Sequence, residues 1–185
     1  MHEDDIWQEC GANGERLMNG GLSADEKSKE FYYGVAIMLY RYRDEQVEYL
    51  FQHRSKLIIG NPDKWDVSAG GHVNYEEPCV NAMVREAKEE IGADIDPTRL
   101  EYAGEYRAGT DRYVRLYFYD WQDNSSDFHF DDQEVSEVKW VAFDQLVEFW
   151  PNLKGVLQND AIYQTMLLKW TKTIQEKYGN HQSKN

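Results

Sequence analysis

Three glutamates on one predicted helix are the residues of this chain best suited to do chemistry. Glu86, Glu89 and Glu90 are spaced so that an α-helix would place their side chains within an arc of roughly 100°. Like charges at this spacing destabilise an isolated helix by a few tenths of a kcal/mol per pair. A hard divalent cation such as Mg²⁺ or Mn²⁺ would compensate, because it prefers oxygen ligands and often joins carboxylates to phosphate groups. A solvated acidic helix face would contain the same three residues, so the surrounding sequence is needed to distinguish it from a metal site.

The glutamates belong to a longer pattern of fixed spacing, G-x5-E-x7-R-E-x-x-E-E-x-G. Its positions are filled by Gly71, Glu77, Arg85, Glu86, Glu89, Glu90 and Gly92. At ordinary residue frequencies, seven such positions would coincide by chance in about one of 10⁵ to 10⁶ chains. The pattern resembles the signature of the Nudix hydrolases. Ala87 and Ala93 occupy two positions where that family has bulky aliphatic residues, a departure that concerns packing more than ligation.

The resemblance implies a fold and a reaction. The fold class would be α/β (α+β), with the mixed β-sheet sandwiched between helices that defines the Nudix fold. The reaction would be metal-dependent hydrolysis of a diphosphate linkage in a nucleoside diphosphate derivative or a related small molecule, with Mg²⁺ or Mn²⁺ as cofactor. The metal would neutralise the charged phosphate oxygens that otherwise repel an attacking water.

The resemblance also implies roles for individual residues. The metal ligands would be Glu86, Glu89, Glu90 and the backbone carbonyl of Gly70. Glu86, Glu89 and Arg85 would take part in catalysis, with Glu77 and Gly71 supporting the metal ligands. Arg85 would fix the orientation of the carboxylates through paired hydrogen bonds.

Four further candidates do not occupy fixed positions of the pattern. Glu134 is our preferred additional catalytic residue, because the family often takes a base or a further ligand from a later loop; Glu137 is a weaker choice of the same kind. Arg54 and His72 match positions where relatives contact phosphate. Each has an alternative reading: Glu134 as a solvated strand edge, Arg54 as a surface cation and His72 as a structural histidine.

Two other functions stay open at this point. The segment 65–72 resembles the branch that contains isopentenyl diphosphate isomerases and their hydrolytic relatives. Those isomerases place a catalytic cysteine directly before the Gly-His pair, where this chain has Gly70, and their glutamate pattern is less regular. Hydrolysis is therefore favoured over isomerisation. A catalytically weak, nucleotide-binding regulatory module is the third hypothesis.

The elements that must position these residues follow from hydrophobic patterning. A helix is predicted from Pro78 to Gly92, with Val80, Val84, Ala87 and Ile91 packed on a sheet and the three glutamates on the opposite face. A short helix is expected at 144–149 and an amphipathic helix at 160–178. Runs of β-branched and aromatic residues predict strands, and a polar stretch predicts a loop at 122–133. The predicted strands cover 34–43, 46–54, 100–107, 113–121 and 135–143.

The predicted organisation is one domain behind a short extension. Residues 1–30 are polar and contain several glycines, so we expect an N-terminal extension that could form a short hairpin packed on the core. Residues 31–185 would form the Nudix hydrolase domain. Relatives are often dimers, so a homodimer is one possible assembly.

The charge balance restricts the partners. The chain has 185 residues, with 20 Lys and Arg against 34 Asp and Glu, a formal net charge of −14. This charge opposes a nucleic-acid coat and an anionic membrane surface, but it allows a small diphosphate substrate that arrives with a cation. Two cysteines are too few for a disulfide framework, and no secretion signal or apolar span is evident. A cytoplasmic location is therefore expected.

Overall fold

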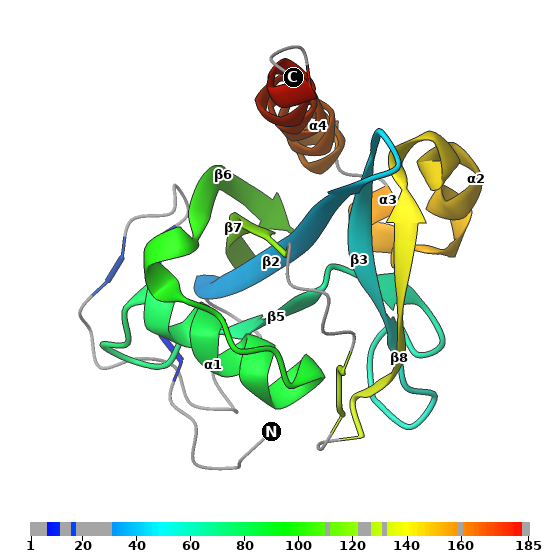
Figure 1. The fold of residues 1–185 in the computed structure, drawn as a ribbon. Coiled ribbons are helices and arrows are strands. Elements are labelled where there is room, and N and C mark those ends of the chain that lie inside the picture. Colours follow the sequence, from blue (N-terminus) through cyan, green and yellow to red (C-terminus); the bar gives the residue numbers. More distant parts are fainter. Residues whose placement is uncertain are drawn as a thin grey trace.

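The computed structural model describes residues 7–11, 16–17, 31–109, 112–121, 127–130, 133–158 and 161–182. A mixed β-sheet forms the middle layer, with helix α1 (Cys79–Ile91) against one face and helix α4 (Ala161–Gln182) against the other (Figure 1). This arrangement confirms the predicted mixed sheet between helices.

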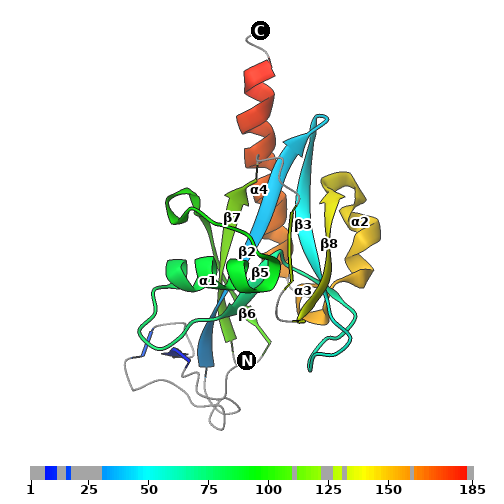
Figure 2. The same ribbon diagram turned by 60° about the horizontal axis from the view of Figure 1, so that its bottom comes forward.

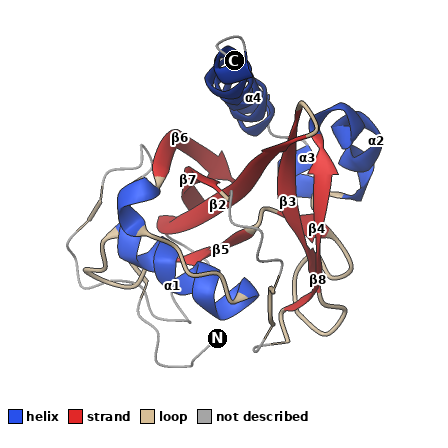
Figure 3. Cartoon of the chain, in the orientation of Figure 1, coloured by secondary structure: helices blue, strands red, loops and turns tan. Residues whose placement is uncertain are grey.

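The sheet is built around the long strand β2. The strands follow the order β4-β3-β2-β7-β6, while β1 and β5 also pair with β2, and β8 pairs with β3 (Figure 3). β2 and β7 run parallel, and the other strand pairs of the described residues are antiparallel. The strands are β1 (Glu9–Cys10), β2 (Phe31–Arg43), β3 (Gln46–Arg54), β4 (Trp65–Asp66), β5 (Ala69–His72), β6 (Glu101–Ala108), β7 (Arg112–Asp120) and β8 (Val135–Ala142).

Strand β2 is apolar almost without interruption because nearly all of its residues are buried. Successive side chains of a strand point to opposite faces, and here both faces are covered. Ile37 and Leu39 join the core beside α1, whereas Met38 and Tyr40 join the core beside α4. The two helices therefore hold the sheet from both sides and fix the position of α1 relative to β5.

Helix α1 begins and ends close to the prediction. Pro78 is its N-cap, so the helix starts one residue later than expected, and Gly92 ends it in the left-handed conformation with φ of 67°. Most other helical segments are single turns. They are η1 (Pro97–Arg99), η2 (Phe143–Gln145), α2 (Leu146–Phe149), η3 (Trp150–Asn152) and α3 (Gly155–Gln158). Elements η2 and α2 together form the short helix predicted at 144–149.

The predicted amphipathic helix corresponds to α4, which begins at Ala161 and extends to Gln182. Its C-terminal turns run past the ends of the strands (Figure 2). Within the loop predicted at 122–133, residues 122–126 and 131–132 lie outside the described residues. No helix in the part of the chain that the structure describes is long and apolar enough to cross a bilayer.

Strands β4 and β5 were not predicted. β5 has the sequence Ala-Gly-Gly-His, which carries little strand propensity. It forms because it pairs with the first half of β2, and because Ser68, the residue directly before it, is held by hydrogen bonds. The Ser68 hydroxyl donates to the Leu50 carbonyl at 2.6 Å and accepts from the Leu39 amide at 2.8 Å. This anchoring places Gly70 and Gly71 under helix α1.

The described part of the N-terminal segment packs on the same end of the sheet. β1 pairs with β2, and the Leu17 amide donates to the Glu9 carbonyl at 3.0 Å. Trp7 is buried and stacks on His72, with ring centroids 3.5 Å apart. The division into an extension at 1–30 and a domain at 31–185 remains a prediction.

Candidate active site

A cavity of about 840 Å³ lies between α1, β5 and the loop that follows β3. This volume is in the range that holds a small-molecule ligand. Among the described residues, the lining combines carboxylates, the two glycines of β5 and four cationic side chains. The charged lining residues include Glu86, Glu89, Glu90, Arg85, Glu134, Arg54, Arg112 and Lys154.

Glu90 is the most buried carboxylate of the cavity. Its exposed fraction is 5 %, and its Oε2 accepts hydrogen bonds from the Gly70 amide at 2.8 Å and from the Gln52 side chain at 3.0 Å. Burial raises its pKa well above the usual value, and the charge of Glu86 adds to the effect. The prediction that all three glutamates lie on the helix face away from the sheet is therefore wrong. Glu90 faces the sheet, where the Gly70 amide of β5 and the Gln52 side chain of β3 bind its carboxylate.

Glu86 lies one helical turn earlier and directly over Gly71. A Cβ atom added to Gly71 would lie 2.2 Å from the Glu86 carboxyl carbon, so any larger residue here would force the Glu86 carboxylate to move. Burial raises the pKa of Glu86 to about 7, despite the opposing charge and hydrogen bond of Arg85. We call Glu86 and Glu90 the acidic wall of the cavity.

Arg85 holds the acidic residues in place through one guanidinium group. Its Nη1 donates to Glu86 at 2.8 Å and to Glu89 at 3.1 Å. Its Nη2 donates to Glu77 at 3.1 Å and to the His72 carbonyl at 2.9 Å. Burial acts to lower the pKa of Arg85, but the hydrogen bond to Glu77 and the charge of Glu86 outweigh it and raise the pKa. Arg85 therefore stays charged and orients three carboxylates at once.

The acidic wall has the donor chemistry that a divalent cation needs. Burial raises the pKa of both carboxylates, and the charge of Glu86 raises that of Glu90 further, so a bound cation would stabilise their charged forms. Glu89 is different, since its side chain is 54 % exposed and pairs with Arg85. Within the described ranges, no three Asp, Glu, His or Cys side chains are already gathered into a metal-binding cluster. The fit therefore rests on Glu86 and Glu90.

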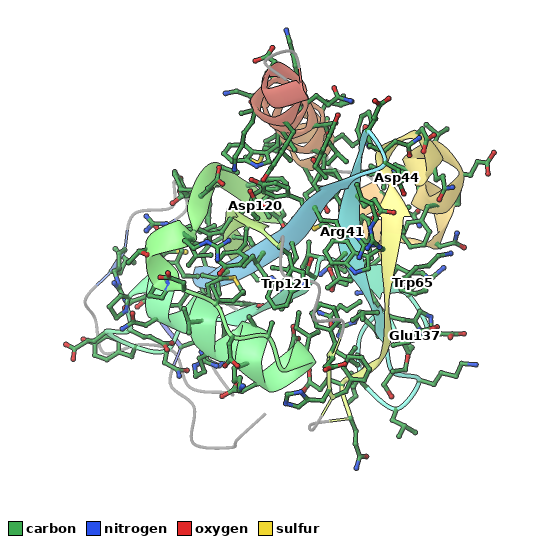
Figure 4. All side chains as sticks on the ribbon, in the orientation of Figure 1. Arg41, Asp44, Trp65, Asp120, Trp121 and Glu137 are labelled. Atoms are coloured by element: carbon green, nitrogen blue, oxygen red, sulfur yellow. The ribbon has the colours of Figure 1, made fainter. Side chains whose placement is uncertain are left out.

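Of the two later glutamates, Glu134 is the one that lines the cavity. Its backbone carbonyl accepts from the Ser55 amide at 2.8 Å, which ties the start of β8 to the end of β3. Glu137 lies further along β8, where Figure 4 labels it. Its side chain is 63 % exposed, with a carboxylate oxygen 3.8 Å from Nδ1 of His53. Glu134 therefore lies where it could act on a ligand in the cavity, whereas Glu137 does not line the cavity.

The two predicted phosphate contacts, Arg54 and His72, also line the cavity. Arg54 donates to Asp66 at 3.4 Å and to the Gly60 carbonyl at 3.3 Å. His72 forms the floor beside Trp7. Their roles remain predictions, but both side chains lie where a bound ligand could meet them.

Sequence reasoning missed Arg112 and Lys154 as cavity residues. Arg112 begins β7, and Lys154 follows η3, where its amide donates to the Trp65 carbonyl at 2.9 Å. The Lys154 ammonium pairs at 2.5 Å with Asp66, which is buried. No spacing rule connects these positions, because the fold alone brings them together. Their only sequence signal is a positive charge in a strongly acidic chain.

Comparison with known proteins agrees with this geometry. The model of the NUDIX domain matches residues 32–165, so the chain belongs to the Nudix family. An uncharacterized Nudix hydrolase of Listeria innocua is 34 % identical over 105 residues, which cover 56 % of this chain and 60 % of that protein. The chain thus spans about 60 % of the length of the curated Listeria relatives that it matches.

Solved structures share the fold. DR0079 from Deinococcus radiodurans has a TM-score of 0.65 at 18 % identity, covering 84 % of this chain and 95 % of that one. The NUDIX domain of Shewanella oneidensis NrtR, solved in complex with ADP ribose, has a TM-score of 0.61 at 18 % identity and covers 77 % and 90 %.

Proposed function

We propose that this protein hydrolyses a diphosphate linkage in a nucleoside diphosphate derivative or a related small-molecule diphosphate. The observation that carries the proposal is a pair of carboxylates, buried Glu90 and partly buried Glu86, on the lining of a cavity of ligand size. Membership of the Nudix family and the hydrolase names of its relatives add support. In the reaction, the oxygen of water bonds to phosphorus and the bridging P–O bond breaks. The proton of the water passes to a base, and the leaving phosphate departs.

Glu86 and Glu90, together with the carbonyl of Gly70, would hold Mg²⁺ or Mn²⁺. The bound ion would neutralise phosphate oxygens and lower the pKa of a water molecule. Arg85 orients Glu86 and Glu89, while Glu77 fixes Arg85 from the other side. Glu89 is exposed enough to join the metal shell or to hold a metal-bound water through a hydrogen bond.

Glu134 is our candidate for the residue that accepts the proton from water. It lines the same cavity as the acidic wall but comes from a different element, so it could approach a water from another side. Arg54 and His72 would contact the phosphate oxygens of the substrate. A carboxylate base contributes typically about 10²- to 10⁴-fold to a rate.

The adenosine diphosphate moiety of ADP ribose, which the Shewanella protein binds, belongs to the proposed substrate class. That structure is a reason to include ADP ribose among the first compounds tested. A cytoplasmic location and assembly as a homodimer remain predictions from the sequence, as does the boundary at residue 30.

Isomerisation is less well supported. An isopentenyl diphosphate isomerase of the related branch needs a cysteine before the Gly-His pair, and the described lining residues include none. Cys79 is buried in the first turn of α1, and burial raises the pKa of its thiol. A regulatory module without turnover would keep the cavity but release no phosphate.

A panel assay tests the proposal. Nucleoside diphosphate sugars, ADP ribose, dinucleoside polyphosphates, nucleoside triphosphates and isoprenoid diphosphates are incubated with Mg²⁺ or Mn²⁺, and phosphate and nucleoside monophosphate release are measured. We expect hydrolysis of at least one compound by the wild-type protein and loss of that activity in Glu90→Gln. Glu148→Gln, on the exposed side of α2, is the matched control. Tight nucleotide binding without turnover across the panel would favour the regulatory hypothesis instead.

A further inference from the structure

Three cationic side chains from separate elements meet on the cavity that contains the acidic wall. Arg54 ends β3, Arg112 begins β7 and Lys154 follows η3, and all three line the cavity beside Gly70 and Gly71. We call Arg54, Arg112 and Lys154 the basic wall. In a chain of net charge −14, such a cluster is unusual enough to need a physical reason.

The basic wall carries more positive charge than its neighbours neutralise. The carboxylate that pairs with it among the described residues is Asp66, whose Oδ2 accepts from Lys154 at 2.5 Å and from Arg54 at 3.4 Å. The second oxygen of Asp66 accepts from the Val67 amide at 2.7 Å. Burial lowers the pKa of Lys154, Asp66 opposes that shift, and the charges of Arg112 and Arg54 lower the pKa further. A bound anion would relieve this repulsion.

Arg112 is the member of the wall with the most unused binding capacity. Its Nε atom is buried and has no hydrogen-bond partner, and no carboxylate of the described residues forms an ion pair with it. Its guanidinium carbon lies 5.8 Å from the centre of the Tyr32 ring, and its stem crosses Gly34. A Cβ atom on Gly34 would lie 3.2 Å from the Arg112 Cδ and 3.1 Å from the Gly71 carbonyl oxygen. Arg112 therefore lies close to β5, whose Gly71 also supports Glu86.

A phosphate group fits these conditions better than other ligands. Its oxygens accept several charge-assisted hydrogen bonds at once, and a guanidinium offers them in a planar pair. A cation would be repelled, and an apolar group would leave the buried nitrogen of Arg112 without a partner. Both walls line one cavity together with Gly70 and Gly71, so a diphosphate bound there could contact both.

We propose that Arg112 and Lys154, together with Arg54, bind the second phosphate group of the substrate, the one that the acidic wall does not hold through its metal. The inference rests on the proposed function for the identity of the ligand as a diphosphate. It assigns Arg112 and Lys154 as binding residues and Asp66 as the positioning residue that holds Lys154 and Arg54. The basic wall then selects compounds with two adjacent phosphates over those with one.

Calorimetry with inorganic pyrophosphate in EDTA tests the basic wall without metal or turnover. We expect the wild-type protein to bind pyrophosphate, and Arg112→Gln to bind it at least about 10-fold more weakly. This is the loss expected when a hydrogen bond to a charged group is removed. Arg115→Gln removes the same charge from the same strand, but Arg115 pairs with Glu105 outside the cavity, so its affinity should stay at the wild-type level. Thermal melts verify that each variant is folded.

A second variant protects the test against misfolding. Lys154→Met with Asp66→Asn neutralises both members of the Lys154–Asp66 ion pair, and it should also weaken pyrophosphate binding. Absence of binding to the wild-type protein, or equal affinity in Arg112→Gln and Arg115→Gln, would overturn the proposal. If hydrolysis fails across the panel while Arg112 still controls pyrophosphate affinity, the basic wall stands and the proposed reaction falls. If hydrolysis succeeds while the variants bind pyrophosphate as tightly as the wild type does, the proposed reaction stands and the proposed role of the basic wall falls.

Discussion

The acidic wall and the basic wall line one cavity but are built in different ways. Glu86 and Glu90 come from one turn of α1, where a single arginine and two glycines of β5 hold them. The basic wall is assembled from the ends of β3 and β7 and from the segment after η3. A charge cluster can thus be specified by local helical spacing, as in the acidic wall, or only by the topology of the sheet, as in the basic wall.

The two walls also differ in how they are balanced. In the acidic wall, carboxylates are buried close together, which raises their pKa values. In the basic wall, buried Asp66 forms ion pairs with Lys154 and Arg54, while the buried Nε of Arg112 has no hydrogen-bond partner and could bind a ligand. A metal ion on one wall and a phosphate on the other would satisfy both imbalances.

Glu90→Gln should abolish most of the activity while preserving the fold. We expect a fall in kcat/KM greater than the roughly 10- to 100-fold typical of residues that only support a metal ligand. In EDTA the melting temperature should be unchanged or higher, because a neutral amide avoids the cost of a buried charge. The amide can also donate to Gln52 Oε1, which has no partner. Steady-state kinetics and thermal melts on one preparation check both outcomes; lost activity together with a strongly lowered melting temperature would indicate a structural role.

Gly71→Ala should disturb the acidic wall through Glu86 alone. The new methyl group would lie 2.2 Å from the Glu86 carboxyl carbon, so the carboxylate has to move. We expect activity to fall by about 10- to 100-fold, the range for changes that misplace a metal ligand. Gly155→Ala is the control, because nothing lies within 4 Å of its added Cβ. Equal activity of the two variants would show that the position of Glu86 does not matter.

Arg85→Lys should weaken the metal site by about 10-fold, at the lower end of the effects of residues that orient ligands. A lysine keeps the charge but cannot donate to Glu86, Glu89 and Glu77 from one planar group. Titration of activity with Mg²⁺ should therefore show a higher half-saturating concentration. Arg115→Lys serves as the reference, and a Mg²⁺ dependence identical in both variants would refute the orienting role.

Lys154→Met should have the smallest effect, and on stability rather than on the metal site. It leaves Asp66 with Arg54 and the Val67 amide as partners, so we expect a loss of about 1 kcal/mol in the free energy of unfolding. Adding Asp66→Asn should recover part of that loss, since it removes the buried charge. Urea denaturation of both variants measures the difference. A double variant less stable than the single one would contradict this description of the basic wall.

The contrast between the walls also explains what could be predicted from the sequence. Helix α1 and its glutamates were readable because their spacing is local, and the long strands because their apolar runs are continuous. β5 could not be predicted, since its glycines gain strand structure only by pairing with β2. The inward orientation of Glu90 was missed for a similar reason: helical periodicity cannot show that a β5 amide and the Gln52 side chain offer hydrogen bonds to its carboxylate. Arg112 and Lys154 lie far apart in sequence, and only the folded sheet brings them together.

The most direct test of the account is a crystal structure with Mn²⁺ and methylene diphosphonate, a diphosphate analogue that water cannot cleave at its bridge. We expect an anomalous Mn²⁺ peak coordinated by Glu86 and Glu90. We also expect one phosphonate group on that ion and the other within hydrogen-bond distance of Arg112 and Lys154. An ion bound away from both glutamates would contradict the central claim that the acidic wall is the metal site of a diphosphate hydrolase.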